Sequence, residues 1–296
     1  MKNRVITIGT FDGVHLGHQR VVQTTQKIAE ALKLEPMVIM LSYAPKFNGS
    51  VENRYLITTR EERMFLIKEI FSGIIESIDT TTGDIYDFTA YEFIQYLKQK
   101  YYLAHMVVGF NHSFGKDRSG NAVFLAENAN NFEIGFTVVP PVKIEDKVIS
   151  SSLIRNLLKE GDVRKANRCL GRFYSLQGIV QKGAGIASTL GFRTINLDIP
   201  EKKIIPKNGV YAVITEVSGR IFPGACYIGS SPTLGLDRFA VEVHIIGYNE
   251  ELYGQKVNIS FVDFLREDKK FDNVESLKSQ IVQDISQAKA LISNLF

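Results

Sequence analysis

Apolar and polar positions follow an alternating pattern over the first half of this 296-residue chain. Between residue 4 and about residue 140, short apolar runs of strand type alternate with longer segments whose apolar positions recur at helical spacing. The expected strands are 4–8, 37–41, 74–78, 105–109 and 136–139. The expected helix starts carry Thr-x-x-Glu capping boxes and are Thr58, Thr59 and Thr89. This alternation predicts an α/β domain with a parallel sheet and helices on both faces.

The pattern changes in the second half. After a short hairpin expected at 142–149 and a short helix capped by Asp162, strand-like runs with period-two alternation follow one another closely. These runs are 174–180, 209–217, 224–229, 240–246 and 256–264. They predict a small antiparallel β-barrel. We therefore expect two domains, 1–170 and 171–296.

A helix is expected after the last strand, with Asp272 as its N-cap. Its apolar positions form one stripe at helical spacing, which consists of Val274, Leu277, Ile281, Ile285, Ala288 and Ile292. We expect this stripe to pack against the barrel.

The turn after the first strand, Gly9–Gln19, concentrates the chemically informative residues. Its glycines allow a close approach of the backbone to a ligand, and the following helix offers N–H groups and a positive dipole end. His15 and His18 stand three residues apart and project from the same first turn. The combination suits a triphosphate. Taken alone, the histidine pair is also compatible with a metal site, with capping side chains or with two ordinary surface residues.

Two further segments carry candidate binding residues. The turn 107–121 follows a strand, but it is not a P-loop, because five residues separate Gly109 from Gly115 and Asp117 stands where Ser or Thr should be. The segment 149–155 places three serines and an arginine at a helix start. The serines could simply cap that helix.

Composition limits the classes of function. Lys plus Arg number 35 against 32 for Asp plus Glu, and the small excess is spread along the chain, so nothing argues for nucleic-acid binding. Cys169 and Cys226 are the only cysteines, and their spacing suggests neither a disulfide framework nor a zinc site. No signal-peptide pattern and no apolar run of membrane-spanning length is present. We expect a soluble cytoplasmic protein without a membrane partner.

Three segments of the first half carry a family resemblance. The Gly9–Gln19 string resembles the His-x-Gly-His signature of the nucleotidylyltransferase superfamily, in the form found in prokaryotic FAD synthetases. The block at 107–115 is similar to the family's Val-Val-Gly-x-(Asp/Asn)-Phe-x-Phe-Gly, with His112 in place of the usual aromatic residue, and 149–155 is similar to its Ile-Ser-Ser-Thr-x-x-Arg motif. The resemblance implies a Rossmann-like nucleotidyltransferase domain that transfers AMP from ATP to FMN and releases FAD and pyrophosphate.

The resemblance also assigns roles to residues. It implies that His15, His18 and Arg155 act on the phosphates during transfer. It implies nucleotide or flavin contacts for Gly9, Phe11, Asp12, Gly17, Asn111, Ser151 and Ser152. No nucleophile is required from the protein, since the FMN phosphate itself attacks, so alignment and charge neutralisation are the expected contributions.

The second half resembles a riboflavin kinase domain. The matching blocks are 191–196, 208–211, 228–233, 241–244, 252–254 and 265–271. By resemblance, Thr194 and Asn196 would bind Mg²⁺ and an ATP phosphate, and Glu242 would be the base that activates the ribityl hydroxyl of riboflavin. The departures from the family pattern are Ala187 for a glycine, Ser188 for an arginine, Arg193 for a proline and Tyr227 for an asparagine.

These departures leave the second activity open. A missing phosphate contact costs about 1.5–3 kcal/mol, enough to slow a reaction roughly tenfold to a hundredfold, which favours a weak or absent kinase. The intact Thr194, Asn196 and Glu242 favour a fully bifunctional enzyme. Another alternative is that the barrel is a non-catalytic flavin-binding, regulatory or assembly module. A nucleotidyltransferase with a different acceptor is a further alternative.

Overall fold

The computed structural model describes residues 2–42, 55–79, 85, 87–182, 191–230 and 239–295. The chain forms two compact units, Met1–Glu52 with Leu56–Ser151 and Asn53–Tyr55 with Ser152–Phe296. The boundary between Ser151 and Ser152 lies ahead of the predicted domain boundary at 170/171, which stays a prediction.

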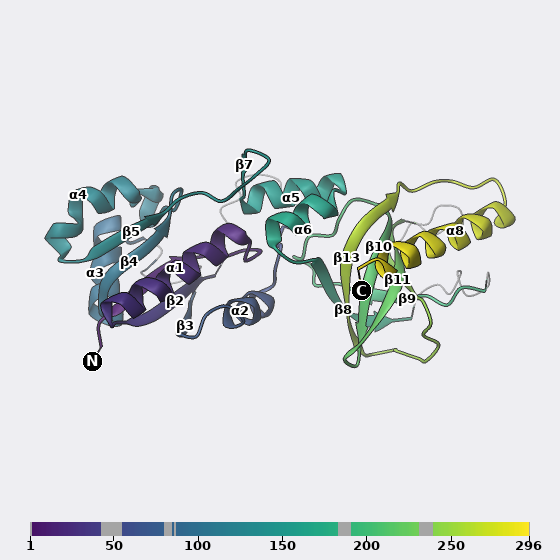
Figure 1. The fold of residues 1–296 in the computed structure, drawn as a ribbon, viewed down its shortest axis with the longest axis horizontal. Coiled ribbons are helices and arrows are strands. Elements are labelled where there is room, and N and C mark those ends of the chain that lie inside the picture. Colours follow the sequence, from purple (N-terminus) through teal and green to yellow (C-terminus); the bar gives the residue numbers. More distant parts are fainter. Residues whose placement is uncertain are drawn as a thin grey trace. The chain divides into compact units, whose positions relative to one another are not determined.

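The first unit contains the predicted parallel sheet (Figure 1). Its five strands are β1 (Arg4–Gly9), β2 (Glu35–Leu41), β3 (Ile74–Ile78), β4 (Leu103–Gly109) and β5 (Gly135–Val139). They lie in the order β3-β2-β1-β4-β5, and all neighbours run parallel. The helices are α1 (Leu16–Leu32), α2 (Arg60–Lys68), α3 (Ala90–Tyr101) and α4 (Ala122–Phe132). The sheet prediction is confirmed, and α4 is an element that the sequence pattern did not predict.

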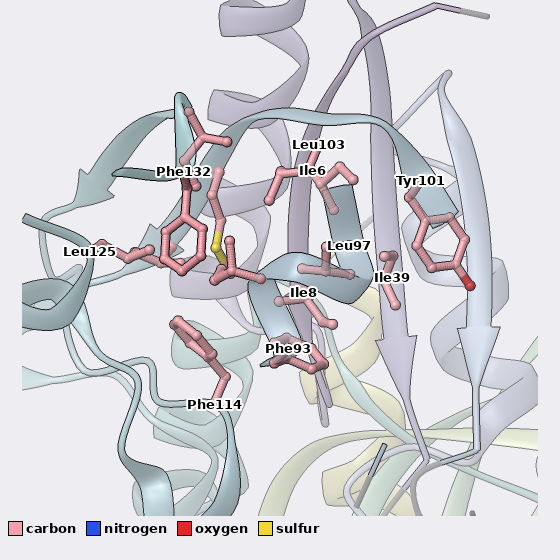
Figure 2. Close-up of a cluster of buried hydrophobic side chains, with 14 of the residues drawn as sticks. Ile6, Ile8, Ile39, Phe93, Leu97, Tyr101, Leu103, Phe114, Leu125 and Phe132 are labelled. Carbon is pink, nitrogen blue, oxygen red and sulfur yellow. The ribbon is translucent and has the colours of Figure 1, made fainter. Parts of the chain in front are cut away.

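Residues of β1 alternate between two buried faces, as expected for a strand covered on both sides. Val5 packs with Val21 and Ala29 of α1. Ile6 and Ile8 point the other way and pack with α3 and α4, as Figure 2 shows for Phe93, Leu97, Leu125 and Phe132. The sheet is therefore covered by helices on both faces, and the loops after β1 and β4 emerge at the same edge because these neighbouring strands run parallel.

Local signals account for the helix starts. Thr59 and Thr89 are N-caps with complete capping boxes, which confirms these two predictions. Thr58 does not cap a helix but serves the candidate site described below. The predicted hairpin is β6 (Lys143–Ile144) with β7 (Lys147–Val148), and its two turn residues, Glu145 and Asp146, have φ of 49° and 62°.

The second unit contains a closed barrel in the strand order β10-β11-β12-β9-β8-β13 (Figure 1). Its strands are β8 (Tyr174–Gln181), β9 (Ile195–Asp198), β10 (Gly209–Val217), β11 (Arg220–Ser230), β12 (Phe239–Ile245) and β13 (Lys256–Arg266). Before them come α5 (Ser151–Glu160), whose first residue still groups with the first unit, and α6 (Val163–Leu170), capped by Asp162 as predicted. The barrel is confirmed, and the short β9 is its one strand that the sequence pattern did not predict.

The last helix, α8 (Val274–Ser293), differs from expectation in two ways. Its N-cap is Asn273, whose side chain accepts a hydrogen bond from the Ser276 N–H, so the prediction of Asp272 was wrong. Of the apolar stripe only Ala288 and Ile292 are buried, and they pack on the barrel, while Val274 is 51% exposed. An ion pair between the buried Asp284 and the partly buried Arg266 of β13 fixes the middle of the helix.

Candidate active site

The turn between β1 and α1 has a strained backbone. Phe11, Gly13 and Val14 all have left-handed φ values, 49°, 86° and 40°. Such a value is unusual for a β-branched residue such as Val14 and persists only where surrounding contacts enforce it. Phe11 and Val14 are both buried, in a cluster that includes Val22 of α1 and Val38 of β2. The strain therefore lies in a packed segment, as is common at ligand-binding turns.

Asp12 is the residue that fixes this turn. It is fully buried, and its carboxylate accepts hydrogen bonds from the backbone N–H groups of Ile57 (3.1 Å) and Thr58 (3.0 Å). The Thr58 hydroxyl lies 3.2 Å from the same carboxylate and accepts a hydrogen bond from the Gly13 N–H at 2.8 Å. Asp12 was predicted to contact nucleotide or flavin. In the structure its hydrogen bonds to Ile57 and Thr58 hold the turn in shape, and Thr58 was predicted as a helix cap.

The two histidines lie face to face on the N-terminus of α1. His15 is the N-cap, and its Nδ1 accepts a hydrogen bond from the His18 N–H at 3.3 Å, so the proton of the neutral ring is on Nε2. The rings stack with centroids 3.6 Å apart, and Phe11 meets His18 edge to face at 5.4 Å. A Cβ on Gly17 would lie 3.0 Å from the His15 ring, so the glycine leaves room for this arrangement.

His18 is held in its neutral form. Its pKa lies well below the usual value, first because the ring is desolvated and then because His15, His112 and Arg63 place like charge near it. Its Nδ1 is buried without a hydrogen-bond partner among the described residues. A neutral imidazole at this place can donate one hydrogen bond, and an arriving anion would raise its pKa.

Arg63 is a site residue that sequence reasoning missed. It is buried on α2, and its Nη1 donates to the Thr10 carbonyl at 2.6 Å, which ties α2 to the turn. Its charge acts on His18. The sequence shows only one more polar residue in an amphipathic helix; a buried arginine cannot be recognised there without the long-range contact.

The turn after β4 forms the second part of the site. The His112 N–H donates to the Gly109 carbonyl, and Phe114 and Gly120 exchange two backbone hydrogen bonds that close the loop. Asn111 is exposed. His112 lies close enough to His18 to influence its pKa, so the structure brings the turns after β1 and β4 together.

The predicted phosphate-binding residues of α5 belong to different units: Ser151 to the first, Ser152 and Arg155 to the second. The Ser151 hydroxyl donates to the Asp12 carbonyl at 2.9 Å, which joins the helix start to the turn. Ser152 is exposed, and Arg155 donates through Nε to the Tyr55 carbonyl at 2.7 Å, both within the second unit. The roles of Gly9, Ser152, Asn111 and Arg155 toward substrates stay predictions.

The barrel has its own candidate site, on three adjacent strands. Asn196 of β9 lies directly opposite Glu242 of β12, and Glu242 lies opposite Tyr227 of β11. Burial raises the pKa of Glu242, which makes it a stronger base than an exposed carboxylate. Thr194 directly precedes β9. The Tyr227 hydroxyl lies 3.1 Å from a carboxylate oxygen of Asp268.

Two of the departures from the riboflavin kinase pattern, Arg193 and Tyr227, lie among the described residues. Arg193 donates to the Asn249 carbonyl and pairs with Glu251 at 3.5 Å, so its guanidinium is engaged with that loop. Tyr227 takes part in the row just described. Ala187 and Ser188 lie outside the described residues.

The oxygen donors of Thr194 and Asn196 are of the kind that Mg²⁺ prefers, and the pairing of β9 with β12 places Asn196 opposite Glu242, the predicted base. Among the described residues, no group of three or more His, Cys, Asp or Glu side chains could hold a metal ion. Both cysteines are buried and free, as expected. None of the described helices is long and apolar enough to cross a membrane.

Comparison with known proteins covers both units. A family model described as FAD synthetase matches residues 1–153, and one described as riboflavin kinase matches residues 170–292. The bifunctional riboflavin kinase/FMN adenylyltransferase of Bacillus subtilis is 33% identical over 98% of this chain and 93% of its own length. That of Listeria monocytogenes is 32% identical over 99% and 94%. A crystal structure described as a macrolide-efflux protein from Streptococcus pneumoniae has a TM-score of 0.87 at 27% identity, over 98% of this chain and 95% of that one.

Proposed function

The chain belongs to the FAD synthetase family, and on that premise we propose that the turn between β1 and α1 transfers AMP from ATP to FMN. The observation that carries this mechanism is the stacked pair of His15 and His18 on a helix N-terminus, in a turn whose strained shape is fixed by Asp12. The relatives from Bacillus subtilis and Listeria monocytogenes are named riboflavin kinase/FMN adenylyltransferases, and they match nearly the whole chain.

In the transfer, a phosphate oxygen of FMN attacks the α-phosphorus of ATP, and the bond from that phosphorus to the bridging oxygen breaks, with pyrophosphate as the leaving group. The protein supplies alignment and stabilisation of charge. First-turn N–H groups of α1 other than that of His18, which bonds to His15, donate to phosphoryl oxygens together with the Nε2–H of His15. His18 enters the reaction neutral and gains basicity as the anionic substrate arrives.

The remaining predicted residues bind substrate in this proposal. Ser151, Ser152 and Arg155 hold the β- and γ-phosphates, and Asn111 holds the substrate at the loop after β4. An arginine fork matches phosphate oxygens well. Mg²⁺ carried by ATP would offset charge on the phosphates.

His18→Ala tests this proposal. We expect FAD formation from FMN to fall to background, while the unfolding transition and circular dichroism stay those of the parent chain. His105→Gln is the matched control, because His105 lies near the start of β4 and bonds to Thr137. If His18→Ala makes FAD at the parent rate, the site is assigned to the wrong residues.

For the barrel, we propose a riboflavin kinase whose rate is lowered by its altered loop. The pairing of Asn196 with Glu242, and the raised pKa of that carboxyl, support a working base. By resemblance, Ser188 replaces an arginine that would contact phosphate and Ala187 replaces a glycine, and these two departures support the lowered rate. Restoring the family residues with Ala187→Gly and Ser188→Arg should raise FMN formation from riboflavin about tenfold to a hundredfold.

Two outcomes would correct this view of the barrel. An unchanged rate in the restored variant would mean that the loop departures cost nothing and the enzyme is fully bifunctional. Flavin binding without FMN formation in both chains would identify the barrel as a non-catalytic flavin-binding module.

A further inference from the structure

His112 occupies a position where the family resemblance leads one to expect an aromatic residue. It lies in the turn after β4, and β4 is the parallel neighbour of β1, so this turn and the His15–His18 turn meet at one edge of the sheet. The imidazole stacks on Phe114, with centroids 6.1 Å apart and an interplanar angle of 26°. A phenylalanine at this position would keep that packing but would lose both ring nitrogens.

The polar end of His112 is not used by the fold. Its Nε2 is buried and has no hydrogen-bond partner among the residues that the structure describes, and the same holds for Nδ1 of His18. An unpaired buried nitrogen is costly, and native structures seldom keep one without a purpose. Two such atoms, on two rings of which His112 lowers the pKa of His18, indicate a place that is completed by a bound molecule.

The charges around both rings indicate the sign of the charge that the bound molecule carries. Besides desolvation, His15, His112 and Arg63 lower the pKa of His18, and Arg118 of the turn after β4 lowers the pKa of His112. These groups are arginines or histidines, and each lowers the pKa of the ring on which it acts. The Asp12 carboxylate is directed at the backbone of Ile57 and Thr58. An anion near the two rings would therefore be attracted by the charges of Arg63 and Arg118.

We propose that His112 is a third imidazole of the nucleotidyl-transfer site and that its Nε2–H donates a hydrogen bond to a phosphoryl oxygen of the bound substrate. The proposal rests on the function proposed above for this turn. It assigns to His112 a substrate contact that the aromatic residue of the family pattern could not make. The phosphoryl oxygen could belong to FMN or to the triphosphate, and the experiment separates these sources.

The test uses the full chain and three variants. His112→Phe keeps the packing on Phe114 and removes the donor, and His112→Gln places an amide N–H near the former Nε2. His105→Gln removes an imidazole from β4, the strand before this turn, without reaching the turn, since His105 bonds to Thr137 of β5. Calorimetry measures the affinity for inorganic pyrophosphate, and initial rates give KM for FMN in FAD synthesis and for pyrophosphate in the reverse reaction.

We expect His112→Phe to weaken one phosphate interaction about tenfold to a hundredfold, with the glutamine variant intermediate and the His105 control unchanged. A rise confined to the KM for FMN places the donor on the FMN phosphate, whereas weaker pyrophosphate binding places it on the triphosphate. Parent-like values for both ligands in a folded His112→Phe chain would overturn the proposal. If the parent chain makes no FAD, the proposed function fails, and calorimetric titrations of the parent and His112→Phe chains with pyrophosphate and with FMN still decide whether His112 binds phosphate.

Discussion

Thr58 offers a direct test of whether the network around Asp12 shapes the active turn. Its hydroxyl accepts from the Gly13 N–H at 2.8 Å and lies 3.2 Å from the Asp12 carboxylate, in a place that is 3% exposed. Thr58→Val keeps the shape and removes both hydrogen bonds. One neutral bond contributes about 1 kcal/mol and one to a charged group about 2 kcal/mol, so the variant should lose about 3 kcal/mol of unfolding free energy.

For a unit of this size that loss corresponds to a Tm lower by roughly 6–12 °C, measured by calorimetry. The relaxed turn should also move His15, and a displacement of this kind costs about a hundredfold in kcat for FAD synthesis. Thr58→Ser is the matched control, because it keeps the hydroxyl and should lose about 1 kcal/mol and little activity. Equal stability and equal activity in the valine and serine variants would refute the reasoning.

Three further predictions follow from named contacts. Gly17→Ala puts a Cβ 3.0 Å from the His15 ring, which should displace the ring and lower kcat/KM for FMN adenylylation at least tenfold. The Tm should not fall, because alanine favours a helix. A parent-like kcat/KM would show that the position of the His15 ring is unimportant. Burial lowers the pKa of His112 to about 4, whereas the ring of the unfolded chain binds its proton near pH 6.5. The folded state is therefore destabilised as the pH falls below 6.5. Denaturant titrations should show the free energy of unfolding dropping by about 2 kcal/mol between pH 7 and 5, and by less in His112→Phe. Asp284→Ala leaves the Arg266 guanidinium without its buried partner and should cost about 3 kcal/mol or more in unfolding free energy. The double variant Arg266→Met with Asp284→Leu should be nearly as stable as the parent chain. A parent-like Tm for the single variant would contradict this reasoning.

The sequence predicts the architecture well because local signals and global fold agree here. The five parallel strands, the capping boxes at Thr59 and Thr89, and the barrel all follow from periodicity and turn chemistry. The errors are where local signals compete. Asp272 and Asn273 are both good caps, and only the backbone of Asn273 decides between them. Val274 continues the apolar stripe of α8, but the barrel is covered only by the second half of that helix.

The candidate site is less predictable, because its important contacts are long-range. The motif indicates His15 and His18, yet nothing in the sequence indicates that Thr58 bonds to Gly13 and Asp12, or that Arg63 reaches the carbonyl of Thr10. Each of these contacts joins residues more than forty positions apart. His112 is visible in the sequence only as a departure from the family pattern, and its buried, unpartnered nitrogen is a property of the folded chain.

The fate of the individual phosphates of ATP tests the central claim most directly. The purified chain is incubated with FMN and with ATP that carries a radioactive label on either the α- or the γ-phosphate, and the products are separated by chromatography. The account predicts that the α-label appears in FAD and the γ-label in pyrophosphate, in equal amounts. Absence of the α-label from the flavin product, or transfer of the γ-label to FMN, would contradict it.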